Sequence, residues 1–116
     1  MINLELFFAI SLLIQLAHSC EELLTGFHRK WFFIKMSFLT FLLLDTVCSL
    51  FFVLVFIFPN FPYRIFLQYF FLLLMFANGV EHIVWWGSIK KYVPGLVTAF
   101  LHIFLFCIFY FQLLSN

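Results

Sequence analysis

The chain has 116 residues, of which 66% are hydrophobic, 24% are aromatic and only 9% are charged, and its formal net charge is +1. A soluble domain of this size carries much more charge, so the composition excludes an ordinary soluble protein. The sequence predicts an integral membrane protein.

Four stretches are apolar over the length of about 20 residues that a helix needs to cross a bilayer. They cover residues 4–25, 38–58, 63–87 and 93–114. Glycine or proline marks the breaks between them, at Gly26, Pro59, Pro62, Pro94 and Gly95, as expected where helices end. Helices joined by short links run antiparallel, so we expect an all-α fold: a single domain (residues 1–116) built as an antiparallel bundle of four transmembrane helices.

The positions of the basic residues predict how the chain is oriented. One end of the expected bundle has Arg64, and the other end has Arg29, Lys30, Lys35, Lys90 and Lys91. Positive side chains in short loops tend to stay in the cytoplasm. We therefore expect residues 26–37 and 88–92 on the cytoplasmic side of the cell (inner) membrane and both termini outside.

Ionisable residues lie inside the apolar stretches without basic partners. Four of the five acidic residues are there, namely Glu21, Glu22, Asp45 and Glu81. Three of the four histidines join them, namely His18, His82 and His102. An ionised carboxylate at the centre of a membrane helix costs at least about 2.5 kcal/mol. The carboxylates are therefore either protonated or neutralised by a bound cation.

These polar residues share a depth and a face. A rise of about 1.5 Å per residue places them in one layer, about 6–15 Å below the expected cytoplasmic surface. Helical spacing puts His18 and Glu22 on one face of the first helix and Asn78 and His82 on one face of the third. Because lipid cannot satisfy polar faces, we expect the four faces to converge inside the bundle.

Residues 17–22 resemble residues 77–82, with an offset of sixty residues. His18 matches Asn78, Glu21 matches Glu81, and Glu22 matches His82. A pseudo-twofold axis along the membrane normal would set the two segments face to face. Chance similarity between polar positions is the alternative.

Three short motifs, in this order, resemble those of the HXXEE-domain family of small integral membrane proteins. Residues 18–22 fit HxxEE, residues 78–82 fit NxxxH, and Tyr92, Pro94 and Gly95 fit YxPG. The resemblance implies a membrane protein without an assigned function, from a group suspected of enzymatic activity. It also singles out the residues of the first two motifs, namely His18, Glu21, Glu22, Asn78 and His82.

The chemistry of the polar residues favours a buried metal centre. Imidazole nitrogen and carboxylate oxygen suit zinc or iron, and four-helix bundles hold one or two such ions between inward Glu and His side chains. The expected ligands are His18, Glu21, Glu22, Glu81, His82 and His102. The expected catalytic groups are Glu21, Glu81 and Asp45, with Asn78 orienting a bound water or ligand. Haem fits poorly, because its iron has no use for several nearby carboxylates.

We expect a membrane metalloenzyme that acts on a lipid or another membrane-dissolved small molecule, by hydrolysis with zinc or by oxidation with two irons. The expected partners are membrane lipid and this hydrophobic substrate, and no nucleic acid. The alternative is a metal-ion or proton transporter that uses the same cluster. Such a transporter would be a homodimer, because four spans enclose too little volume for a pathway. Another alternative is a metal-free enzyme with Glu21 or Glu22 as general base. A further one is that these polar side chains only form hydrogen bonds between the helices.

The turn containing Tyr92, Pro94 and Gly95 has two interpretations. Proline suits the first turn of a helix, so we expect Pro94 to begin the fourth helix. A lid over the site is the alternative.

Overall fold

A computed structural model describes residues 3–116, which form five helices and no strand. The helices are α1 (Leu4–Thr25), α2 (Phe27–Lys30), α3 (Phe38–Ile57), α4 (Arg64–Ile89) and α5 (Leu96–Ser115). Within the described residues, the four helices other than α2 are long and apolar enough to cross a membrane. The structure confirms the all-α fold and the expected membrane protein.

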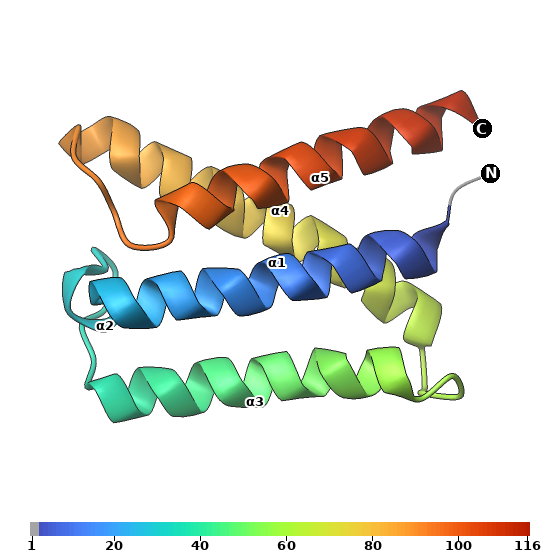
Figure 1. The fold of residues 1–116 in the computed structure, drawn as a ribbon, viewed down its shortest axis with the longest axis horizontal. Coiled ribbons are helices and arrows are strands. Elements are labelled where there is room, and N and C mark those ends of the chain that lie inside the picture. Colours follow the sequence, from blue (N-terminus) through green and yellow to red (C-terminus); the bar gives the residue numbers. More distant parts are fainter. Residues whose placement is uncertain (1–2) are drawn as a thin grey trace.

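The long helices run up and down beside one another. In Figure 1, α1 lies between α3 and α5, and α4 crosses behind it; the longest axis of the molecule is 41 Å. The links at residues 26–37 and 90–95 lie at one end. The start of α1, the end of α5 and the link between α3 and α4 lie at the other end. This is the antiparallel bundle predicted from the sequence, whereas the side of the membrane on which each end lies stays a prediction.

The observed helices differ from the predicted spans at their ends. The first span has the predicted bounds, the second ends at Ile57, and the third covers Arg64–Ile89. The fourth begins at Leu96, because Gly95 precedes it with a φ of +90° that is not helical. The expectation that Pro94 lies in the first helical turn is therefore wrong, and residues 93–95 form a buried turn instead.

Apolar side chains fill the interior in three clusters. One joins α1, α3 and α4 through Phe8, Leu12, Phe52, Val55, Phe71 and Met75. A second joins α1, α4 and α5 through Phe7, Leu72, Leu105 and Phe109. The third lies around α2 and comprises Phe27, Phe41, Trp85, Val93 and Leu96. The polar residues of the bundle are enclosed among these clusters.

Arg64 ties three helices together at the end near the termini. Its guanidinium group donates to the backbone carbonyls of Val55 at 2.8 Å and Phe56 at 3.0 Å, and it forms an ion pair with Glu5. The side-chain amide of Gln68 also donates to Glu5, at 3.0 Å. Arg64 thus satisfies carbonyls at the end of α3, which the helix itself leaves unpaired, and fixes the start of α1.

Close packing of α4 against α5 depends on Gly79. A Cβ atom at this position would lie 2.9 Å from the backbone oxygen of Ala99. Small residues let the backbones of membrane helices approach closely. Asn78 and Thr98, which precede Gly79 and Ala99 in the chain, both contact His18.

Candidate metal centre

Three buried side chains from two helices converge on one point. His18 and Glu22 lie one turn apart on α1, His82 projects from α4, and one ligand atom of each lies within 4.8 Å of the others. Glu22 Oε2 is 3.2 Å from His82 Nε2, and Glu22 Oε1 is 3.5 Å from His18 Nε2. Bonds to zinc of about 2.0–2.1 Å in a tetrahedron set ligand atoms about 3.4 Å apart. Each histidine thus lies near this distance from one oxygen of Glu22, an arrangement that could hold a metal ion.

The far side of the His82 ring fixes which nitrogen carries the proton. His82 Nδ1 lies 3.0 Å from the backbone carbonyl oxygen of Asn78, which can only accept a hydrogen bond. Nδ1 therefore carries a proton, and in the neutral ring Nε2 would direct its lone pair toward Glu22. A backbone carbonyl on the outer nitrogen is a common way to orient a histidine that binds metal.

The His18 ring is oriented in the same way by a chain of two hydrogen bonds. The Thr98 hydroxyl donates to Glu21 Oε1 at 2.7 Å, so its oxygen accepts from His18 Nδ1–H at 2.6 Å. On the other side of the ring, the amide of Asn78 lies 3.2 Å from His18 Nε2 and donates to it. His18 Nε2 therefore also carries a lone pair.

The Nε2 atoms of both histidines thus lie close to one carboxylate inside the bundle, and that of His18 also accepts from the Asn78 amide. His18 and His82 have no exposed surface, and Glu22 is 5% exposed. Acceptors gathered in this way without a shared proton repel one another, and burial of the carboxylate without a positive partner is costly. A cation at the point of convergence removes both penalties.

The turn before α5 covers the two imidazole rings. A Cβ atom on Gly95 would lie 2.6 Å from His82 Nε2 and 2.7 Å from His18 Cε1. Only glycine allows this approach, and its φ of +90° is also a conformation that glycine adopts readily. Pro94 beside it is fully buried. The turn therefore closes the site at this end of the bundle.

Glu21 points to α5, whereas its neighbour Glu22 points to the histidines. The carboxylate of Glu21 accepts from the backbone N–H groups of Val97 at 3.2 Å and Thr98 at 2.9 Å, as well as from the Thr98 hydroxyl. The Tyr92 hydroxyl donates to it as well. Burial and the hydrogen bond to Glu21 raise the pKa of Tyr92. Glu21 thus caps the start of α5, and the structure does not bring it into the group formed by His18, Glu22 and His82.

The residues of all three sequence motifs meet at this site. A family model described as a protein of unknown function with HXXEE motif matches residues 9–110. The chain belongs to this HXXEE family. This confirms the resemblance found in the motifs, whereas comparisons with curated proteins and with solved structures give no match.

In the HXXEE protein two of the three matched pairs are in contact, whereas Glu21 points to α5 and Glu81 to Trp31. His18 contacts Asn78, and Glu22 contacts His82; in each pair the two residues lie 60 positions apart. The two similar segments therefore face each other across the centre of the bundle.

A hydrogen-bonded chain links α5, α1 and α3 beside the three-residue group. His102 Nε2 lies 3.2 Å from Gln15 Oε1, the Gln15 amide donates to Ser19 at 3.3 Å, and the Ser19 hydroxyl donates to Asp45 at 2.8 Å. The His102 ring centre lies 5.5 Å from that of His18. All four long helices thus contribute to one polar layer, although His102 and Asp45 lie outside the group of close ligand atoms.

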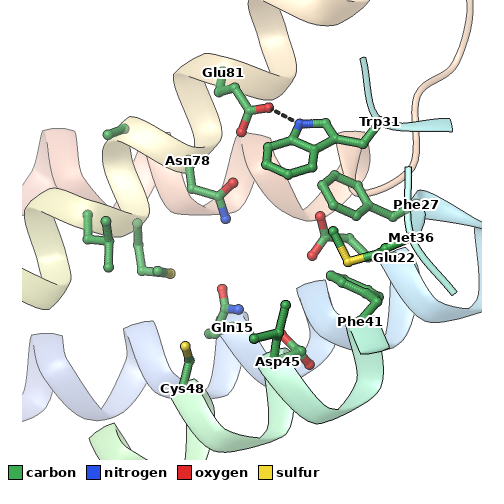
Figure 2. A pocket seen from close by; sticks show the side chains of 14 residues that line it. Gln15, Glu22, Phe27, Trp31, Met36, Phe41, Asp45, Cys48, Asn78 and Glu81 are labelled. Atoms are coloured by element: carbon green, nitrogen blue, oxygen red, sulfur yellow. Dashed lines mark hydrogen bonds between the residues drawn. The ribbon is translucent and has the colours of Figure 1, made fainter. Parts of the chain in front are cut away.

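A cavity of about 500 Å³ adjoins Glu22 between α1, α3 and α4. Figure 2 shows the carboxylates of Glu22, Asp45 and Glu81 and the amide of Asn78 around it. Its other lining residues are Gln15, Phe27, Trp31, Met36, Phe41, Leu44, Cys48, Leu74, Met75 and Ala77. The indole N–H of Trp31 donates to Glu81 at 2.7 Å (Figure 2). The cavity is therefore apolar over most of its wall and acidic at a few points.

Several residues of the site were not singled out by the sequence. The candidate residues predicted from the sequence do not include Thr98, Gln15, Ser19 or Trp31. Thr98 lies four residues before His102, so helical periodicity places the two on one face of the helix. No local signal marks Trp31, because its contact with Glu81 joins residues 50 positions apart.

Proposed function

We propose that this HXXEE protein is an integral membrane metalloenzyme in which His18, Glu22 and His82 bind one divalent zinc or iron ion. The observation that carries the proposal is the convergence of His18, Glu22 and His82, all buried, with one ligand atom of each within 4.8 Å of the others. Two imidazoles and one carboxylate leave coordination positions free for water or substrate. This donor set serves both catalytic zinc and non-haem iron, so the proposal covers hydrolysis and oxidation.

The other polar residues have supporting roles in this proposal. A bound ion would supply a Lewis acid that activates water or dioxygen. Asp45 and Glu81 line the cavity beside Glu22 and are the candidates for the general base. The amide of Asn78 donates to His18 Nε2 and would be released to orient a ligand of the ion when that nitrogen binds metal, and Glu21 holds Thr98 and thereby the His18 ring.

The apolar cavity supports a lipid or another membrane-dissolved molecule as the substrate. Most of its wall is made of Phe, Leu, Met and Trp side chains. Apolar side chains of this kind line most ligand pockets, where they cover the apolar surface of the bound molecule. The substrate would enter with its reactive group toward Glu22.

A transporter is less well supported by the packing. Transport requires a polar path from the site to the end of the bundle near the termini. Phe8, Leu12, Phe71 and Met75 pack together in that direction, and the Ser11 hydroxyl between them and the site has no hydrogen-bond partner among the described residues. This packing favours a pocket that ends inside the bundle.

Metal analysis of the purified protein tests the proposal. We expect about one zinc or iron ion per wild-type chain, and loss of the ion in Glu22→Gln and in His82→Gln, because each removes one of three ligands. Glu5→Gln and His28→Gln are the matched controls, since they make the same changes outside the site and should retain the ion. Thermal unfolding of each variant verifies that it is folded. A wild-type protein without stoichiometric metal, or full retention by both ligand variants, would refute the proposal.

A further inference from the structure

We infer that the cavity between α1, α3 and α4 binds an amphiphile whose head group is a protonated amine. The inference deepens the proposed function, because it names the class of substrate that would reach the metal ion. Binding itself depends only on the cavity and its lining residues, so it can be measured separately from metal content.

The charge of the cavity selects the head group. Three carboxylates line it, those of Glu22, Asp45 and Glu81, and no Lys or Arg is among the lining residues. A divalent ion on Glu22 and the histidines would balance two negative charges and leave one. In an apolar membrane interior a remaining negative charge is costly, and a monovalent ammonium group balances it. A phosphate or carboxylate head would add to the negative charge.

Two of the carboxylates have an oxygen available for a ligand. Ser19 donates to Oδ1 of Asp45, and Trp31 donates to Oε1 of Glu81. Among the described residues neither second oxygen accepts a hydrogen bond, although His82 Nδ1 lies 3.8 Å from Glu81 Oε2. An ammonium group has three N–H donors and no acceptor, so it fits these free acceptors.

Aromatic rings provide a second source of attraction for a cation. The rings of Phe27 and Trp31 stack with centres 5.2 Å apart, and those of Phe27 and Phe41 lie 5.0 Å apart. All three line the cavity, on the side of Glu22 shown in Figure 2. The faces of aromatic rings attract ammonium groups, and more strongly where water is excluded.

The mouth of the cavity explains why the ligand has a hydrocarbon tail. Leu44 of α3 and Leu74 of α4 line the cavity and are 55% and 40% exposed on the outer surface. Both lie well inside helices that are long and apolar enough to span a membrane. The opening between α3 and α4 therefore faces hydrocarbon, so a head group reaches the carboxylates while its tail stays in the bilayer.

Equilibrium binding of three ligands with the same chain length tests the inference. Dodecylamine, dodecanol and dodecanoic acid are titrated against the full chain in nanodiscs of uncharged lipid, and the signal of empty nanodiscs is subtracted. We expect saturable binding of dodecylamine, about tenfold tighter than that of the alcohol or the acid, because a hydrogen bond to a charged group typically contributes a factor of about ten or more. Asp45→Asn and Glu81→Gln should each weaken amine binding by about tenfold, whereas Glu5→Gln, the same kind of change outside the cavity, should not.

The same preparations separate this inference from the proposed metal centre, since each is assayed for metal and is measured with and without chelator. The inference would be overturned, and the metal proposal left intact, if metal-containing protein bound the amine no more tightly than the other ligands and the Asp45 and Glu81 variants bound it as the wild type does. Selective amine binding by wild-type protein without metal would support the cavity inference while the proposed enzyme fails. Equal binding of amine and acid overturns the inference in either case, and thermal unfolding shows whether a variant with weak binding is folded.

Discussion

Replacing Thr98 with valine removes the hydroxyl that connects Glu21 to His18 and keeps the shape of the side chain. Two hydrogen bonds are lost, of 2.6 Å to His18 and 2.7 Å to Glu21. The backbone N–H groups of Val97 and Thr98 still hold Glu21, so the start of α5 should stay in place. The change therefore acts mainly on the orientation and protonation of the His18 ring.

The expected loss follows from what the hydroxyl does in the folded protein. Removal of the outer partner of a metal-binding histidine weakens metal affinity by about 10–100-fold, or about 1.4–2.7 kcal/mol. The His18 ring has no exposed surface, so its Nδ1–H would be left buried without an acceptor. This should lower the free energy of unfolding by about 1–3 kcal/mol.

Competition with a chelator measures the affinity, and nitrogen NMR of the histidine ring reports which nitrogen is protonated. Thr98→Ser keeps the hydroxyl and should bind metal as the wild type does. Ser11→Ala is the matched control, because Ser11 is a fully buried hydroxyl that forms no hydrogen bond among the described residues. Metal affinity of Thr98→Val within about twofold of wild type, with Nδ1 of His18 still protonated, would refute the reasoning, since an outer partner is worth tenfold or more.

Three further changes test other parts of the structure. Gly95→Ala should abolish metal binding and lower Tm, because its Cβ would lie 2.6 Å from an imidazole nitrogen and the left-handed backbone adds about 1–2 kcal/mol; unchanged metal content would contradict this. Burial and the hydrogen bond to Glu21 raise the pKa of Tyr92. The stabilisation that Tyr92 gives is therefore complete below its unfolded pKa of about 10, and it is lost as the pH rises through its folded pKa. Unfolding between about pH 8 and 12 should therefore show less alkaline loss for Tyr92→Phe than for wild type, and identical profiles would rule out the contact. Arg64→Met removes the partner of Glu5 and should cost about 1–2 kcal/mol in unfolding experiments without changing metal content; loss of metal would show that the two ends of the bundle are coupled.

Hydrophobic length and helical periodicity were enough to predict the bundle. Both are local properties, since about 20 apolar residues cross a bilayer whatever their neighbours are. The same local rule placed His18 and Glu22 on one face and Asn78 and His82 on another. Short links between the spans then made neighbouring helices antiparallel, and the similarity between residues 17–22 and 77–82 correctly anticipated which two segments face each other.

Local signals were weaker where the chain turns. A proline before an apolar stretch favours the first helical turn, yet Pro94 lies before the helix because Gly95 takes a left-handed conformation. The reason for that conformation is a contact over a long sequence distance, since the turn packs against the rings of His18 and His82. No pattern near residue 95 carries that information.

The amino-acid sequence by itself determined that this is a four-span membrane protein with its imidazoles and carboxylates in one layer, because composition and periodicity act within each helix. It could not distinguish the roles of Glu21 and Glu22, which are adjacent and have the same side chain. The two point about 100° apart around α1, and only the packing of α5 on one side and α4 on the other gives them different partners. The tertiary structure therefore decided that Glu22 meets the two histidines while Glu21 holds the start of α5.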